Sequence, residues 1–309
     1  MMLTHTEWYG VRTDAPSLGV LAGLNPAPEE EWDKLRAFLP IAPDEKAGML
    51  ASVEALFRRG PELVVNTYDY LLAHHETAAI LGWESGANPE HLAERRRFFT
   101  IWLARTLGLD MSYDFAHYLF RAGQIHAAHG PRQIQVPERY VTGAISQVNA
   151  AFARFLTEEM PGHPAVPAAL AGWNKLLSLH LHMMLLGYQS ARAWDEGEVP
   201  LTVTLYGKMR NLTQATRREM RLAPGEQVGH ALRKFFNYYP QTRAEVFATG
   251  WQEGERLDET GKPWLTVSPT YQFKMGWRLL LDGRDLSYNG GLSHPIQPGQ
   301  TLSIFPPGR

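Results

Sequence analysis

The stretch from 121 to 146, RAGQIHAAHGPRQIQVPERYVTGAIS, holds the side chains best suited to chemistry. A helical pattern leads into it, and Gly130 followed by Pro131 is a strong helix-end signal. His126 therefore lies about one turn before the end of a helix. Imidazole is a common iron ligand, so His126 is a candidate metal ligand. On spacing alone an alternative stays open, because a single histidine on a helix can equally be a core or surface residue.

A second helix follows a short polar link. Its apolar positions recur at steps of three and four residues: Val141, Ile145, Val148, Phe152 and Phe155. Gly143 and Ala144 lie beside Tyr140 and Ile145, so a large flat ligand could approach the backbone there. Tyr140 and Ile145 are therefore candidate ligand contacts.

This order of features resembles the proximal half of the protoglobin and globin-coupled sensor family. The resemblance implies that His126 is the proximal ligand of a haem iron, and Gly130 directly after His129 favours His126 over that neighbour. The run NTYDYLL resembles the family helix whose tyrosine reaches the distal pocket and hydrogen-bonds the gas, a role that falls on Tyr68. The alternative is a core tyrosine whose hydroxyl has found a partner.

The helix opened by Asn88-Pro89-Glu90 and running to about Leu107 corresponds in order to the helix that covers the distal face in globins. Phe99, Trp102 and Leu103 are its candidate haem contacts. Helix phase does not choose among these three, and each could be ordinary core.

Composition narrows the function further. Lys and Arg number 30 and Asp and Glu 32, a formal net charge of -2, so no basic field attracts nucleic acid. The absence of cysteine excludes disulfides, iron–sulfur clusters, thiolate zinc sites and covalent c-type haem. Any haem is then a non-covalent haem b. The start carries no leader pattern and no run reaches the ~18 apolar residues of a membrane span, which predicts a cytoplasmic protein.

The length of 309 residues suggests two domains. Residues 1–28 lack periodicity and predict a loose arm. Residues 29–194 predict seven or eight helices without a strand, an all-α globin-like domain around a cofactor. The acidic link 195–200, DEGEVP, precedes a change of period from 3.6 to 2, so a second domain spans 201–309.

Start and stop signals divide the helical domain. They predict a helix over 29–38, another from Asp44 that Gly60 ends, and a new one from Pro61. Asp110 is the expected cap of the helix that carries His126. The last helix starts at Pro164 or Pro167.

The second domain resembles the ubiquitin-like sulfur carriers of the MoaD and ThiS families. It shows strands at 201–205 and 219–223, a helix near 228–236, a hairpin at Asp282-Gly283 and a final strand in PGQTLSIFPP. The resemblance implies an α+β β-grasp fold. Those carriers need a C-terminal Gly-Gly, whereas this chain ends Pro-Pro-Gly-Arg, which favours partner binding over sulfur transfer. Residues 250–277 are more than the family needs.

Together the resemblances imply a haem-binding globin that senses or binds a diatomic gas (O2, CO or NO). The ubiquitin-like domain would serve for output or for interaction with a protein partner, and a homodimer is expected through the helices matching 137–160 and 164–193. The alternatives are a haem redox enzyme, such as an NO dioxygenase or peroxidase, a haem-regulated sulfur carrier in molybdopterin biosynthesis, and a haem-free association module. No reductase-like nucleotide motif is visible, so turnover would need an external electron donor, and no catalytic residue is assigned.

Overall fold

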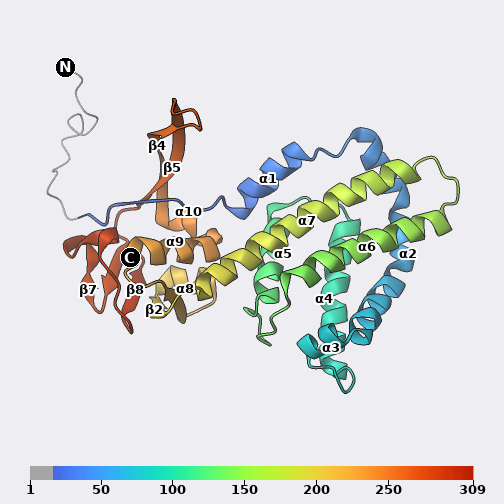
Figure 1. The fold of residues 1–309 in the computed structure, drawn as a ribbon, viewed down its shortest axis with the longest axis horizontal. Helices are drawn as coiled ribbons and strands as arrows, with labels where there is room; N and C mark the ends of the chain where they lie inside the picture. Colours follow the sequence, from blue (N-terminus) through green and yellow to red (C-terminus); the bar gives the residue numbers. More distant parts are fainter. Residues whose placement is uncertain (1–16, 309) are drawn as a thin grey trace. The chain divides into compact units, whose positions relative to one another are not determined.

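The computed structural model describes residues 17–308 (Figure 1). The chain divides into two compact units. One is Pro26–Arg192, and the other consists, within the described chain, of residues 17–25 and 193–308. No helix of the described chain is long and apolar enough to cross a membrane.

The unit Pro26–Arg192 is all helical, as the sequence predicts. Its seven helices are α1 (Pro28–Phe38), α2 (Pro43–Ala73), α3 (His75–Leu81), α4 (Pro89–Leu107), α5 (Tyr113–His126), α6 (Glu138–Glu159) and α7 (Val166–Asp195), the last of which ends just beyond the unit. Each of the long ones buries an apolar stripe against the others, which is the packing of a globin-like bundle.

The prediction of a helix break at Gly60-Pro61 is wrong, because α2 runs straight through both residues. A proline inside a helix costs about 3 kcal/mol through its missing N–H and its ring. Packing offsets this cost, since α2 buries Leu56 before the proline and Leu63 after it, and contacts α4 and α6. Gly60 itself lets α4 approach: a Cβ there would lie 3.4 Å from Leu103 Cδ2.

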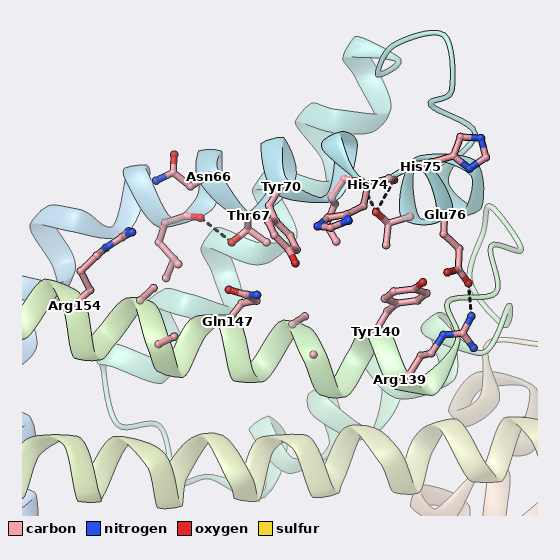
Figure 2. A pocket seen from close by; sticks show the side chains of 17 residues that line it. Asn66, Thr67, Tyr70, His74, His75, Glu76, Arg139, Tyr140, Gln147 and Arg154 are labelled. Atoms are coloured by element: carbon pink, nitrogen blue, oxygen red, sulfur yellow. Dashed lines mark hydrogen bonds and ion pairs between the residues drawn. The ribbon is translucent and has the colours of Figure 1, made fainter.

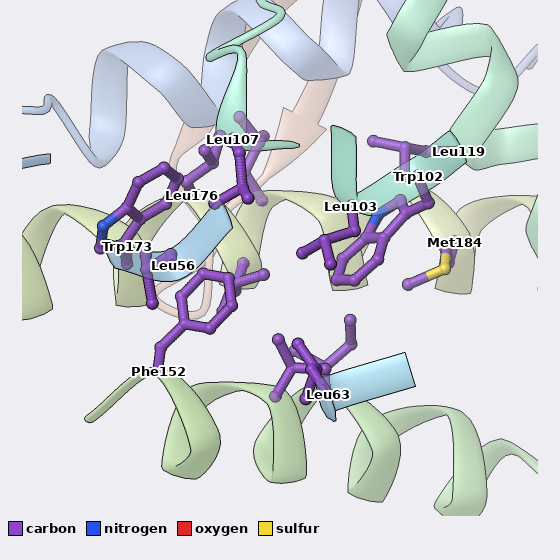
Figure 3. Packing of buried hydrophobic residues seen from close by; sticks show 14 of the residues in the cluster. Leu56, Leu63, Trp102, Leu103, Leu107, Leu119, Phe152, Trp173, Leu176 and Met184 are labelled. Atoms are coloured by element: carbon purple, nitrogen blue, oxygen red, sulfur yellow. The ribbon is translucent and has the colours of Figure 1, made fainter. Parts of the chain in front are cut away.

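Two glycines allow α5 and α7 to cross almost backbone to backbone. A Cβ on Gly123 would lie 1.8 Å from the Met184 carbonyl oxygen, and one on Gly187 would lie 1.8 Å from that of Phe120. No side chain fits at either position. The helices enclose an apolar core, of which Figure 3 shows the members Leu56, Leu63, Trp102, Leu103, Leu107, Leu119, Phe152, Trp173, Leu176 and Met184.

The other unit is α+β. Its elements are β1 (Val20–Ala22), β2 (Val199–Leu205), α8 (Gly207–Thr213), β3 (Arg217–Leu222), α9 (Val228–Tyr238), α10 (Arg243–Val246), β4 (Phe247–Leu257), β5 (Pro263–Phe273), β6 (Arg278–Leu281), β7 (Arg284–Asp285) and β8 (Thr301–Phe305), with short 3-10 turns at 240–242, 286–288 and 291–293.

Five of these strands form one sheet in the order β3-β2-β8-β6-β7. The central pair, β2 and β8, is parallel, and the other neighbours are antiparallel. The helix α9 buries Leu232, Phe235 and Phe236 completely. A hairpin, a helix and a last strand that returns to lie parallel to the first make a β-grasp fold, which confirms the prediction. The hairpin turn also forms as expected, with positive φ at Asp282 (48°) and Gly283 (79°).

A second sheet was not predicted. It has the order β1-β5-β4 and uses the stretch that exceeds the needs of a β-grasp fold. The predicted loose arm is wrong at Val20–Ala22, which pairs with β5 and buries Leu21; residues 1–16 of that arm lie outside the described residues. The helix α8 also forms between β2 and β3, where no helix was predicted.

Candidate functional site

His126 is the last residue of α5, slightly closer to the helix end than predicted. The cap of this helix is Ser112, whose Oγ accepts a hydrogen bond from Phe115 N at 3.2 Å. The predicted cap, Asp110, is wrong: its carboxylate instead accepts from the Ser112 amide (3.0 Å) and hydroxyl (2.6 Å), so it supports the true cap. After His126 the chain turns through Ala128 at a φ of +72°, and the Val136 amide donates to the His126 carbonyl at 2.8 Å.

The imidazole of His126 has a defined tautomer. Its Nδ1 lies 2.7 Å from the carbonyl oxygen of Ala122, and because a carbonyl cannot donate, Nδ1 must carry the proton. Burial lowers the pKa of His126, the bond to Ala122 opposes that shift, and the charge of Arg95 adds to it. Its Nε2 makes no hydrogen bond within residues 17–308. The side chain therefore presents a neutral ring with a free lone pair.

Tyr68 is buried on α2 and faces α4. Its hydroxyl donates to the Arg95 carbonyl at 2.9 Å, and its ring meets Phe99 edge-on with centroids 6.2 Å apart. Burial raises the pKa of Tyr68 to about 12, although the charge of Arg95 opposes the shift. The phenol is therefore a proton donor at any physiological pH. Tyr70, two residues on, is 47% exposed and lines a different surface, as expected for another face of the helix.

The positive charge of Arg95 acts on the pKa of both Tyr68 and His126. Arg95 lies on α4, where burial lowers its own pKa. Its Nε donates toward His91 Nε2 at 3.0 Å, while Trp83 Nε1 donates toward His91 Nδ1 at 3.1 Å. A neutral imidazole accepts at one nitrogen only, so the two donors compete. Sequence reasoning missed this cluster.

Trp102 and Leu103 lie side by side on α4 but meet different neighbours (Figure 3). Trp102 is buried against Phe99, with centroids 5.3 Å apart, and its indole nitrogen has no hydrogen-bond acceptor in the described chain. Leu103 packs over Gly60 in the seam between α2 and α4. Tyr68, Phe99 and Trp102 thus form one continuous set of rings, to which Leu103 does not belong.

The two candidates on α6 are separated from each other. Ile145 is buried in the apolar core. Tyr140 lies in an open groove of about 740 Å³ between α2, α3 and α6, where Gly143 provides the expected room (Figure 2). A hydrogen bond to Glu76 raises the pKa of Tyr140, and Glu76 also pairs with Arg139. The structure thus surrounds Tyr140 with groove residues and not with Tyr68 or His126.

These side chains suit an iron whose other ligands come from a macrocycle. No group of three or more His, Cys, Asp or Glu side chains converges anywhere in residues 17–308, as a bare metal ion would require. His126 instead offers one nitrogen lone pair, directed by a hydrogen bond to the opposite ring nitrogen, a typical arrangement for a metal-binding histidine. An aromatic set and a phenol donor lie on α2 and α4, and the charge of Arg95 on α4 acts on both Tyr68 and His126. The residues fit a haem.

The bundle and the directed histidine define a globin-like protein. A family model described as Protoglobin matches residues 28–194, just over half of the chain, and the chain belongs to that family. No curated protein matches the sequence.

Solved structures match each unit in turn. The globin domain of the Geobacter sulfurreducens globin-coupled sensor is 18% identical, with a TM-score of 0.43, and the match covers 51% of this chain and 97% of that domain. Small archaeal modifier protein 1 of H. volcanii is 15% identical (TM-score 0.26; 36% and 100% covered). A Pyrococcus furiosus protein titled as molybdopterin converting factor subunit 1 is 20% identical (TM-score 0.25; 36% and 100% covered).

Proposed function

We propose that this protein is a haem-binding globin that binds or senses a diatomic gas (O2, CO or NO), and that its β-grasp unit serves for output or partner binding. The observation that carries the proposal is the hydrogen bond from His126 Nδ1 to the Ala122 carbonyl. This bond fixes the tautomer in which Nε2 is free to ligate iron. Membership of the Protoglobin family supports the same assignment.

The residues that would hold the haem divide by role. His126 is the axial ligand, and Phe99 and Trp102 are apolar contacts from α4. Haem would supply an iron that binds the gas reversibly, without covalent attachment because the chain has no cysteine. Tyr68 is the candidate hydrogen-bond donor to the gas, since its raised pKa keeps the phenol protonated. Leu103, Ile145 and Tyr140 stay predictions as haem contacts.

A homodimer through α6 and α7 is part of the proposal, carried over from the family. A sulfur-carrier role is not part of it. The final strand is held at its last residue, since Phe305 stacks on Tyr206 with ring centroids 4.1 Å apart.

The test is a titration of the purified full chain with haem, followed by visible absorption in the ferric, ferrous and carbon monoxide forms. We expect one haem per chain, a histidine-ligated spectrum and a clear change on adding carbon monoxide. Failure to bind haem stoichiometrically would overturn the proposal and leave the helical unit as a haem-free association module.

A further inference from the structure

The β4–β5 hairpin carries a row of apolar side chains with nothing packed over them. Residues directly opposite each other in an antiparallel pair share a face, as do alternate residues along one strand. The register pairs Glu253 with Val267 and Glu255 with Leu265. One face therefore collects the exposed side chains Trp251 (72%), Leu257 (72%), Leu265 (61%) and Val267 (56%).

The same face is buried at its base, where it belongs to the core of the unit. Phe247 and Tyr271 lie on it, 4% and 7% exposed, and Phe236 of α9 packs on Phe247 with ring centroids 4.5 Å apart. Leu21 of β1 extends this face beside Tyr271, but β1 pairs only with residues 270–272 of β5. Beyond that point the apolar face continues uncovered to the tip, which projects away from α9 and α10 (Figure 1).

The hairpin also has an open edge. β4 is the terminal strand of the sheet β1-β5-β4, and its 11 residues have no strand on their outer side in the described chain. Open edges are usually shortened, bulged or blocked with lysine or proline, because their free N–H and C=O groups recruit other strands. β4 has neither lysine nor proline. It remains competent to accept a further strand.

The charges on this face decide what kind of strand fits. Glu253 and Glu255 lie among the apolar side chains, and neither forms an ion pair within residues 17–308. A second copy of the hairpin would bring two more carboxylates to the same place, and like charges directly opposite are destabilising. The uncovered face is also only about 250 Å² from strand spacings, whereas a stable dimer buries about 800 Å² per partner. A short basic segment satisfies both conditions, because it pairs with the carboxylates and needs only a small area.

We propose that the β4–β5 hairpin is a docking site for a short extended segment of a partner protein. The segment adds as a strand along the open edge of β4, and its Lys or Arg side chains lie beside Glu253 and Glu255 while its apolar side chains extend the surface around Trp251. Backbone hydrogen bonds supply affinity, and the alternating side chains supply specificity. This site is independent of haem binding.

The experiment is a selection of phage-displayed random short peptides on the immobilised full chain. Enriched peptides should carry Lys or Arg two and four residues away from an apolar residue, so that all three lie on one face of the added strand, and their synthetic copies should bind the purified chain in fluorescence anisotropy. The Trp251→Ser variant should lose binding, and Glu253→Gln with Glu255→Gln should weaken it about tenfold, as expected for two exposed charge pairs. Trp264→Ser, on the opposite face, should change binding less than twofold.

Because Trp251 and both glutamates are exposed, these variants should keep the wild-type thermal unfolding midpoint, which excludes misfolding as the cause. Three outcomes would overturn the proposal. The first is no enrichment, or enrichment of acidic peptides. The second is undiminished binding by Trp251→Ser. The third is a concentration-dependent dimer in sedimentation that Trp251→Ser abolishes, since the occupant would then be a second copy of the chain.

Discussion

Two regions of the helical unit each bury a histidine, and they differ in what the ring can do. Burial lowers the pKa of both His126 and His180. At the end of α5, His126 is held by the Ala122 carbonyl and keeps one nitrogen free. On α7, His180 is fully buried, stacked on Trp32 and edge-on to Phe115, and neither ring nitrogen has a partner in the described chain. Burial alone makes an imidazole neutral, and a hydrogen bond to one ring nitrogen is needed to direct the other.

The largest effect is expected at the directed histidine. His126→Ala should abolish stoichiometric haem binding or leave a loosely held haem, because the chain loses its axial nitrogen. The matched control is His129→Ala, three residues on, which should bind haem normally. Absorption titrations of both variants would check this, and equal losses in the two would remove His126 from the ligand role.

A second test is steric. It changes the close crossing of α5 and α7, the helices that carry the two histidines. Gly123→Ala should lower the free energy of unfolding by about 3 kcal/mol or more, since its Cβ would overlap the Met184 carbonyl. Gly143→Ala is the control, because nothing lies within 4 Å of that position. It should stabilise α6 by about 0.5–1 kcal/mol. Urea unfolding measures both, and similar destabilisation by the two would contradict the close crossing.

The undirected histidine should instead make stability depend on pH. Burial lowers the pKa of His180 to about 3, with Asp110 opposing weakly, whereas the unfolded chain titrates near 6.5. Between these values the unfolded state binds the extra proton, so stability is lost as the pH falls below 6.5. At pH 5 the loss is about 2 kcal/mol.

His180→Phe should remove that loss and also the cost of two unpartnered nitrogens. The wild type and the variant should therefore diverge in free energy of unfolding between pH 7 and pH 5, with the variant more stable at both. Parallel pH profiles would show that His180 does not stay neutral when it is buried.

The smallest effect is expected at the proposed hydrogen-bond donor, Tyr68. Tyr68→Phe should speed oxygen dissociation from the haem-loaded chain about tenfold, because a hydrogen bond of this kind contributes about 1–1.5 kcal/mol. Stopped-flow dissociation measures it. Tyr70→Phe is a fair control because Tyr70 lines the groove. A dissociation rate that Tyr68→Phe leaves unchanged would remove Tyr68 from the distal role.

Most of the fold follows from local patterns. The helices α4, α6 and α7 show the 3.6 period plainly, and β2 and the Asp282-Gly283 hairpin show the period of 2. The predictions that were wrong concern elements stabilised by residues far away in the sequence. Pro61 has the local signal of a helix start, but the packing of α4 and α6 against both halves of α2 keeps the helix continuous through it. The pairing of Val20 with Gln272 joins segments far apart in the sequence, so neither segment alone predicts it.

The site divides in the same way. A helix end and a family pattern single out His126 and Tyr68 in the sequence, and their roles at the haem stay predictions. Arg95 has no such mark, since its importance depends on the bond that Tyr68 of α2 donates to its carbonyl and on its charge near His91 and Tyr68. One signal was present: His91, Arg95 and Phe99 recur every four residues and so share a face of α4. For Tyr140 the local signal was present but its location was not: the small neighbours correctly indicate open space, and that space is a surface groove.

The hydrogen bond from the Val136 amide to the His126 carbonyl offers a way to observe the histidine from outside its own helix. The amide proton of Val136 is attached to the link that precedes α6, yet its chemical shift and its exchange with deuterated water depend on where His126 holds its carbonyl. Any displacement of His126 would lengthen that bond and expose this proton. Val136 is therefore a built-in nuclear magnetic resonance reporter for the end of α5.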